Sequence, residues 1–424
     1  MRLADNNRIV IVGGGPAGSF TALHLLRFAT AAGLPIKIDI FEGRNFEQPG
    51  PEGCNKCAGI LSSHLTANLH RLDLELPEAL ILARLDTYVL HLGTRELATH
   101  TPNPKHPILS VCRGSGPRLG LKEVPPSFDL WLLEQAQARG ASLHRQRVLQ
   151  IRAAERPIIM LEDREFEADL VVIATGVNSQ VPLDPAWGYH PPRTEVMAQD
   201  EIPMPANVAN NEVHIFFEPP QGLLFGGVVP KRWYANLSLL GRDLPQKAIN
   251  TFLEAHGASL GISHPTPWLC GCRPRVAVSP AKGYYADRMV AVGDCTASRL
   301  YKDGLGSAFL TAESAAHTAI QMGISRQDFA AGYAPTCRQI SQDNRFGRLL
   351  FWLLPLYRRS SFLVDTWLHT ITQEEALPLE QQIHRYALWG LFTGDESYQQ
   401  IFKLLSSRQA ILRMVQGALS RRSK

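Results

Sequence analysis

Three glycines near the start of the chain have the spacing of a phosphate-binding turn. A short apolar run, residues 9–12, leads into Gly13-x-Gly15-x-x-Gly18, and residues 19–26 then have helical spacing. Gly13 permits a tight turn, Gly15 lets the backbone approach a pyrophosphate, and Gly18 lets helix and strand pack closely. The free N–H groups at the start of such a helix attract phosphate. The pattern predicts a strand–turn–helix unit that binds a dinucleotide; the alternative is an ordinary glycine-rich turn.

An acidic residue follows where such a site needs one. Residues 36–41 have the pattern of a second buried strand, and Glu42 ends it. A carboxylate at that place accepts hydrogen bonds from the ribose hydroxyls of an adenosine. Strand, glycines, helix, second strand and acid thus occur in the expected order, which favours a dinucleotide site.

A second nucleotide signature lies late in the sequence. The apolar residues 289–292 end in Gly293-Asp294, and Gly304-x-Gly306 opens a stretch of small residues with helical character. An Asp at a strand end can bind a ribityl hydroxyl, and a helix N-terminus can hold partial negative charge on a flavin ring. One nucleotide-binding half at each end of a domain suits a long cofactor such as FAD; the alternative is a strand–turn–helix without a ligand.

Four cysteines form two close pairs, Cys54 with Cys57 and Cys270 with Cys272. One interpretation makes a cysteine of the first pair a redox or proton-donating thiol, with Lys56 placed to lower a thiol pKa. A second joins all four sulfur atoms around zinc or an iron–sulfur cluster. A third treats them as small buried apolar residues. The spacing alone leaves all three open.

Length and composition place the chain among ordinary globular proteins. It has 424 residues and a formal net charge of +4, so its charge gives no sign of nucleic-acid binding. The predicted first strand begins too early for a secretory signal peptide to precede it, and no apolar run reaches the ~18–20 residues of a spanning helix. We expect a cytoplasmic protein, in which cysteines are thiols, redox groups or metal ligands rather than disulfides.

The remaining patterns predict how these motifs are positioned. Strands alternating with helices indicate a parallel sheet, whereas the Pro-rich middle of the chain has alternating strand patterns typical of an antiparallel sheet. The predicted elements are helical turns within 60–85, a strand at 88–92, a helix at 127–139, strands at 142–151 and 167–176 flanking a hairpin at 157–161, strands at 212–217, 222–229 and 234–240, a strand at 288–294 and helices over 327–424.

In this order the motifs resemble a known family. Gly13-Gly-Gly-Pro-Ala-Gly18, Ala168-Asp-Leu-Val-Val-Ile-Ala-Thr-Gly176 and Val290-Ala-Val-Gly-Asp-Cys-Thr-Ala297 are similar to flavoproteins of the p-hydroxybenzoate-hydroxylase type. Within that group, Cys57-Ala-Gly59 and a strand ending in Pro230-Lys231 resemble the geranylgeranyl reductase-like oxidoreductases. The resemblance covers about residues 1 to 325. The chain differs from the family at Tyr301, Leu305 and Leu224-Phe225-Gly226, on the expected substrate side.

The resemblance implies an α/β fold with three parts. These are a Rossmann-like FAD-binding domain (1–85, 105–180 and 276–326), an inserted antiparallel substrate domain (86–104 and 181–275) and a C-terminal helical region (327–424). It also implies that Cys57 is catalytic and that an Arg, Arg113 or Arg118, approaches the FAD phosphates. The residues expected at the cofactor are Gly13, Gly15, Pro16, Ala17, Gly18, Glu42, Gly43, Arg44, Arg113, Val148, Thr175, Gly176, Gly293, Asp294, Gly304, Leu305 and Gly306.

By this resemblance the chain is expected to reduce C=C bonds of an apolar, isoprenoid-like substrate by hydride transfer from reduced flavin. NAD(P)H docking transiently, or an electron-donor protein, would supply the electrons. The alternatives are an FAD monooxygenase or halogenase on the same fold, or a flavin electron-relay protein with a four-cysteine metal site.

The C-terminal region combines apolar, aromatic and basic residues. Residues 349–357 are rich in Leu, Trp and Phe and precede Arg358-Arg359, while residues 411–419 lead into a basic end at 421–424. Such segments either lie on an anionic membrane surface or pack as a helical cap on the body of the protein.

Overall fold

A largely parallel sheet covered by helices on one face forms one half of the body of the molecule. The computed structural model describes residues 1–102, 107–118, 123–242, 244–262 and 269–422, with side chains up to 420. The strands of this sheet are β1 (Arg8–Val12), β2 (Lys37–Phe41), β8 (Ser142–His144), β12 (Leu170–Ile173), β19 (Tyr285–Ala286) and β20 (Met289–Ala291). The helices on one face are α1 (Pro16–Ala32), α3 (Phe128–Ala138) and α5 (Gly304–His317). The small sheet on the other face consists of β9 (Gln150–Arg152), β10 (Ile158–Met160) and β11 (Glu165–Glu167).

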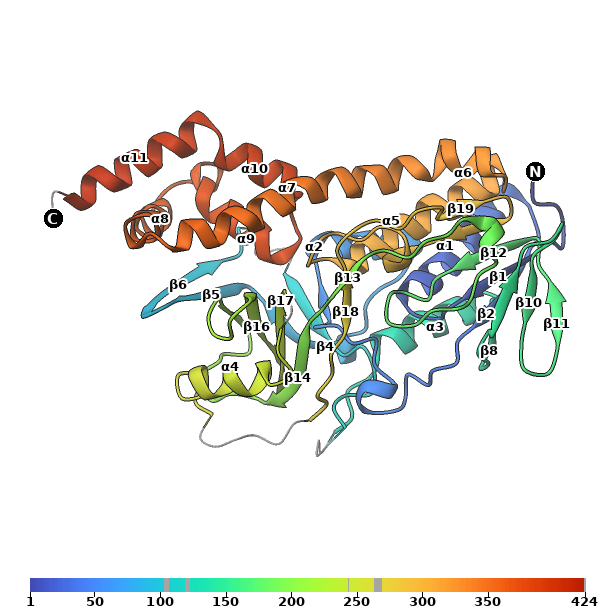
Figure 1. The fold of residues 1–424 in the computed structure, drawn as a ribbon, viewed down its shortest axis with the longest axis horizontal. Coiled ribbons are helices and arrows are strands. Elements are labelled where there is room, and N and C mark those ends of the chain that lie inside the picture. The colour runs from blue at the N-terminus through green and yellow to red at the C-terminus, as the bar shows by residue number, and fades with distance from the viewer. Residues whose placement is uncertain (103–106, 119–122, 243, 263–268, 423–424) are drawn as a thin grey trace.

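The order of this sheet is β19-β20-β12-β1-β2-β8, and all neighbours from β20 to β8 run parallel. Alternate residues of β1 face opposite ways, as strand geometry requires. Ile9 and Ile11 lie in the core with α1, α3 and α5, and Val10 and Val12 lie in the core with β9 and β10. Helices therefore cover one face and a small antiparallel sheet covers the other (Figure 1).

A second, mostly antiparallel sheet forms the other half of the body. Its strands are β5 (Thr87–Leu92), β6 (Arg95–His100), β14 (Ala198–Pro203), β15 (Glu212–Phe216), β16 (Leu223–Lys231) and β17 (Tyr234–Gly241), in the order β14-β17-β16-β15-β5-β6. Helix α4 (Ala248–His256) covers one face, where Phe216 and Phe252 are buried. The other face carries Tyr88, Ile215 and Val229 and packs against the C-terminal helices.

Short strands link the two sheets. β3 (Ile60–Leu61), β7 (Ile108–Val111) and β4 (Ile81–Leu85) form a three-stranded sheet, and β13 (Thr194–Val196) pairs with β18 (Arg275–Ala277). The helical turns predicted within 60–85 exist only in part, as α2 (Ser63–Leu69) and short turns, because both ends of this segment pair with β7 instead. The strand predicted at 142–151 is likewise divided between β8 and β9, which belong to different sheets.

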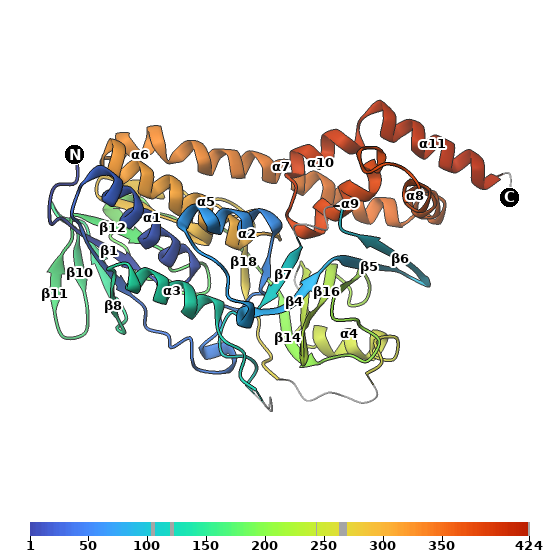
Figure 2. The ribbon, with the colours of Figure 1, turned by 180° about the vertical axis from the view of Figure 1, so that it is seen from behind.

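The C-terminal region is helical, as predicted. It comprises α6 (Arg326–Gly332), α7 (Ala334–Arg358), α8 (Ser361–Glu374), α9 (Ile383–Thr393), α10 (Tyr398–Leu405) and α11 (Arg408–Arg422). The long helix α7 runs from the parallel-sheet half to the antiparallel half, where α8 to α11 gather (Figure 2). Across the described ranges, none of the helices combines the length and apolar character needed to cross a bilayer.

Candidate functional site

A cavity lies where the parallel sheet, the antiparallel sheet and the C-terminal helices meet. The beginnings of α1 and α5 form one end of it, lined by Gly15, Pro16, Ala17, Asp294, Gly304 and Leu305. Apolar side chains from the second sheet and from the C-terminal helices form the other end, lined by Tyr88, Val213, Ile215, Phe225, Phe351 and Phe392. We call the whole space the inter-sheet cavity. It joins two predicted nucleotide-binding motifs that are far apart in the sequence.

The glycine turn before α1 is packed as its sequence predicts. Gly13 has φ +107°, and a Cβ added there would lie 2.5 Å from the carbonyl oxygen of Ala174. A Cβ on Gly18 would lie 1.8 Å from the carbonyl oxygen of Gly13. Only glycine fits either position, because the turn passes directly against its own helix and against the end of β12.

The beginning of α1 is suited to bind an anion. Its N-cap, Gly15, offers no side-chain acceptor, and no acidic residue stands in its first turn. Among the described residues, no side chain caps this end, so its N–H groups and positive dipole end remain available beside the cavity. The residues present therefore fit the pyrophosphate of a dinucleotide cofactor.

Glu42 lies at the end of β2, as predicted, and holds the glycine turn. Its Oε2 accepts a hydrogen bond from the Gly14 N–H at 2.9 Å, and its Oε1 accepts one from the Arg44 N–H at 2.9 Å. Arg44 lines the inter-sheet cavity, whereas Glu42, Gly43 and Val148 lie outside its lining. Val148 is buried in the core behind the parallel sheet.

Arg113 is a buried cation with a fixed partner. Its Nε lies 2.7 Å from Asp129 Oδ1 and its Nη2 lies 3.0 Å from Oδ2, a bidentate pair, and Asn55 also donates to Asp129. Burial lowers the pKa of Arg113, but the Asp129 charge outweighs this and raises it above its ordinary value. Arg113 lines the cavity, while Arg118 is exposed and does not.

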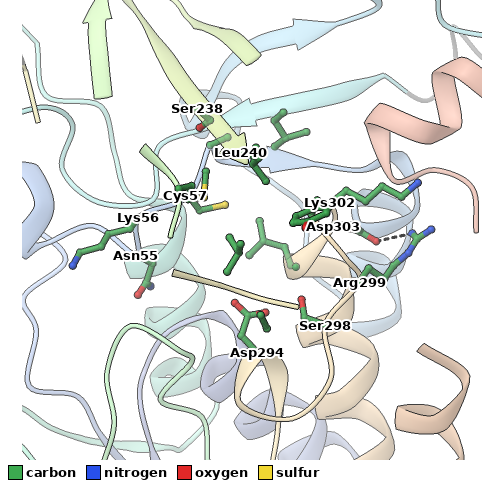
Figure 3. Close-up of a pocket in the computed structure, with 18 of the residues that line it drawn as sticks. Asn55, Lys56, Cys57, Ser238, Leu240, Asp294, Ser298, Arg299, Lys302 and Asp303 are labelled. Carbon is green, nitrogen blue, oxygen red and sulfur yellow. Dashed lines mark hydrogen bonds and ion pairs between the residues drawn. The ribbon is translucent and has the colours of Figure 1, made fainter. Parts of the chain in front are cut away.

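The second motif forms the facing wall of the cavity. Thr175 and Gly176 at the end of β12, and Asp294 after β20, line it with the start of α5. Burial raises the pKa of Asp294, and hydrogen bonding by Ser298 and the charge of Arg113 oppose that shift. Figure 3 shows Asp294 and Ser298 on one side of the cavity. Two further predicted residues lie at the same place: Gly293 turns the chain before Asp294, with φ +70°, and the Gly306 N–H is capped by Asp303.

Cys57 faces the cavity, and the other paired cysteines do not. Its sulfur points into the open space in Figure 3, whereas the Lys56 side chain points away. The Gly59 N–H donates to Cys57 Sγ at 3.5 Å. Cys54, in the same loop, is half-buried and lies outside the cavity lining, and desolvation raises its pKa to about 12, which makes it a poor nucleophile.

The four-cysteine metal site is not formed. All four cysteines lie within the described ranges, and there no group of three or more His, Cys, Asp or Glu side chains is placed to hold a metal ion. Cys270 instead donates from Sγ to Glu201 at 3.5 Å, and burial raises the pKa of Cys272 to about 12. The four sulfur atoms do not converge because the Cys270–Cys272 segment is held by β14, through the bridge between Cys272 and Gln199 and the contact of Cys270 with Glu201, and not by the loop of Cys57.

Several residues of the site were not predicted from the sequence. Lys302 lines the cavity and donates from Nζ to the carbonyl oxygen of Gly390 at 2.5 Å, and Arg299 binds the carbonyl oxygens of Gly394 and Glu396. These contacts tie the loop before α5 to the turn after α9. Basic residues just before the Gly304 motif were the available signal, but their partners lie about a hundred positions later in the sequence.

A second unpredicted feature lies behind the Cys57 loop. Lys231, at the end of β16, is buried, with Nζ 3.6 Å from Glu201 Oε1. A Cβ on Gly59 would come within 3.2 Å of this Nζ. The Pro230-Lys231 sequence marked the position, but nothing in it indicates that the lysine faces inward.

Comparisons with known proteins agree with this arrangement. Residues 124–318 match the model of a family described as FAD dependent oxidoreductase. No curated protein sequence matches the chain significantly. Among solved structures, a geranylgeranyl bacteriochlorophyll reductase-like protein from Thermoplasma acidophilum is similar, with a TM-score of 0.68 and 16% identity over 95% of this chain and 99% of that one.

Other similar structures belong to proteins with different names and activities. A flavoprotein/dehydrogenase from Cytophaga hutchinsonii matches with a TM-score of 0.65 and 14% identity, over 96% of this chain and 98% of that one. A flavin-dependent brominase matches with a TM-score of 0.62 and 13% identity, over 94% and 98%. At these identities the likeness shows the fold, which is the predicted one. Residues 124–318 are thus similar to a family of FAD-dependent oxidoreductases, and the chain has the fold shared by reductase-like and halogenating flavoproteins.

Proposed function

We propose that this chain is an FAD-dependent reductase of C=C bonds in an apolar, isoprenoid-like substrate. The observation that supports the proposal most is the shape of the inter-sheet cavity. It continues from the N-terminus of α1, which suits a pyrophosphate, into a chamber walled by Tyr88, Ile215, Phe225 and Phe392. Such a wall favours a hydrocarbon over a polar substrate.

In this proposal the cofactor is bound by the Gly13 turn and by the motif that contains Asp294 and Gly304. Gly13 to Gly18 and the start of α1 bind the pyrophosphate, with Arg44 and Arg113 nearby as cations, and Glu42 holds the turn through the Gly14 N–H. Thr175, Gly176 and Asp294 bind the part of the cofactor that reaches the start of α5 at Gly304. The bound flavin, when reduced, supplies a hydride for the substrate.

Cys57 is proposed as the proton donor. Reduction of a C=C bond adds a hydride to one carbon and a proton to the other, so a donor group must face the chamber. The thiol of Cys57 does so, and the Gly59 N–H fixes its sulfur. The proton leaves Sγ for the carbon, and solvent later restores it.

Replacing Cys57 tests this role. We expect Cys57→Ser to retain bound flavin but to lose about 10²- to 10⁴-fold in turnover, the range of a missing general acid. Cys272→Ser is the matched control, because Cys272 lies outside the cavity lining, and it should keep full activity. Full activity of Cys57→Ser would exclude the thiol as the donor.

We propose NAD(P)H as the donor of electrons to the flavin. The sequence contains one dinucleotide-binding turn of the Gly13 type, and FAD would occupy it at the start of α1. NAD(P)H would therefore dock only transiently, at another place on the surface of the cavity. Anaerobic mixing with NADH or NADPH should bleach the flavin absorption within seconds. If neither does, while a reduced ferredoxin-like protein bleaches it, the donor is a protein partner.

A monooxygenase or halogenase is the second candidate, because a flavin-dependent brominase shares the fold over most of both chains. Dependence on oxygen separates the two. The reductase proposal predicts that reduced enzyme is reoxidised by an unsaturated isoprenoid without O₂, with a saturated product. Strict dependence of product formation on O₂ would favour the second candidate.

A further inference from the structure

Helix α7 presents an apolar stripe to solvent near its C-terminal end. Leu349 and Leu353 are four positions apart, as are Trp352 and Leu356, and the two pairs interleave on one helix face. Trp352 is 59% exposed and Leu356 42%. Phe362 and Leu363, in the first turn of α8, are also exposed. We call these six residues the α7–α8 patch.

The patch is held in place by the opposite face of the same helix. Leu350 and Phe351 are buried, and Phe351 also lines the inter-sheet cavity. The Tyr357 hydroxyl donates to the carbonyl oxygen of Leu363 at 3.0 Å, which joins the end of α7 to the start of α8. The exposed residues therefore belong to a fixed corner of the fold.

Exposed arginines flank the stripe along α7. Arg345 and Arg348 lie on α7 before the stripe and Arg359 follows it, and all three are exposed. None of them forms an ion pair with any residue that the structure describes. No Asp or Glu occurs in the sequence between Asp343 and Asp365. The fourth arginine, Arg358, is paired with Glu218 at 2.9 Å.

We propose that the α7–α8 patch docks on the surface of an anionic lipid bilayer. Exposed Trp, Leu and Phe side chains insert at the boundary between headgroups and acyl chains, and cations beside them attract anionic headgroups. A second copy of the chain suits the patch less well, because a two-fold contact would bring the same arginines of both copies together. With no membrane-crossing helix among the described residues, the chain lies on the bilayer at this corner.

The position of the patch connects it to the cavity. Trp352 on the outer face of α7 directly follows Phe351, which lines the cavity on the inner face. A bilayer bound at this corner would place dissolved apolar molecules one helix away from the chamber. The docking itself rests only on the surface residues and not on the proposed reaction.

Vesicle flotation of the full-length, FAD-loaded chain tests the proposal. The vesicles are phosphatidylcholine alone, or phosphatidylcholine with a quarter phosphatidylglycerol. We expect flotation with the anionic vesicles, weakened by raising the salt from about 0.1 to 1 M because screening shortens the reach of the arginines. Trp352→Ser/Leu356→Ser should lower the bound fraction at least about tenfold.

Two further variants keep the test decisive. Leu149→Ser is the matched control, since Leu149 is 49% exposed on the parallel-sheet half, and it should float like the wild type. Arg345→Gln/Arg348→Gln changes only exposed cations, and it should lose the preference for anionic over zwitterionic vesicles even if the double serine variant fails to fold. Flavin content and thermal melting report folding.

The proposal is overturned if the wild type does not float with anionic vesicles, or if a folded Trp352→Ser/Leu356→Ser variant floats equally well. It is also overturned if light scattering shows a wild-type dimer that this variant converts to monomers while neither binds vesicles. In that case the patch is an interface between two copies of the chain.

Discussion

At the scale of single residues, the glycine turn is the most demanding part of the cofactor site. Gly18 has no room for a side chain, since an added Cβ would lie 1.8 Å from the Gly13 carbonyl oxygen. Gly18→Ala must push α1 away from β1. We expect a loss of stability of about 1–3 kcal/mol from overpacking, together with weaker FAD binding.

The control for this variant is Gly33→Ala at the other end of α1. A Cβ there meets nothing within 4 Å, although φ is +65°, so the cost is confined to the backbone and FAD binding should be unchanged. FAD titration and urea unfolding of both variants separate the two effects. Equal FAD affinity in Gly18→Ala and the wild type would contradict the role given to this turn.

Some of these residues were predictable from the sequence and others were not, because some depend on local backbone geometry and others on tertiary packing. Gly13, Gly18 and Asp294 belong to motifs whose backbone requirements are local, so spacing alone identified them, whereas Cys57 was predicted from the resemblance to a flavoprotein family. Asp129 lies 16 positions after Arg113 and Gly390 lies 88 positions after Lys302, and each pair joins different elements of the fold. Such pairs depend on tertiary packing, which a local pattern does not record.

At the scale of elements, the α1–α5 contact contains a histidine that cannot accept a charge. His24 is fully buried against Phe309, with ring centroids 4.8 Å apart, and among the described residues neither ring nitrogen has a hydrogen-bond partner. Burial, with the charges of Arg27 and Arg71, lowers its pKa to about 3.

This histidine predicts a loss of stability in mild acid. In the unfolded chain it takes up a proton below about pH 6.5, whereas in the folded chain it stays neutral to about pH 3. The unfolded state therefore binds more protons in this window, and stability falls as the pH drops. Between pH 7 and pH 5 the expected loss from this site is about 2 kcal/mol.

Urea unfolding at the two pH values measures the effect. His24→Leu should reduce the pH dependence by that amount, and His70→Gln, at an exposed position, should leave it unchanged. An identical pH dependence in His24→Leu and the wild type would show that His24 does not resist protonation.

Most elements were predictable because their patterns are strong. The helix predicted at 127–139 appears as α3, and the strands of the antiparallel sheet appear as β15, β16 and β17. The strands β4 and β7 were missed, since they are short and pair with each other in the link between the sheets. Isolated short apolar runs do not distinguish a strand from a helical turn.

At the scale of the whole molecule, the C-terminal helices have a larger part than the sequence indicated. The inward face of α7, with Leu350 and Phe351, packs as a helical cap does, and its outward face carries the α7–α8 patch, for which membrane docking is our proposal. The helices also complete the cavity through Phe351, Leu391 and Phe392. The basic end at residues 421–424 lies beyond the described side chains.

The central claim is that one FAD spans the two helix N-termini, with its adenosine half at the Gly13 turn and its flavin half toward α5. The direct measurement is the identity and stoichiometry of flavin released from the purified, denatured chain, with competition between FAD and FMN for the flavin-free protein. The account predicts one FAD per chain and much weaker FMN binding, because FMN lacks the adenosine half. A folded chain that takes up no flavin, or that binds FMN as tightly as FAD, would contradict it.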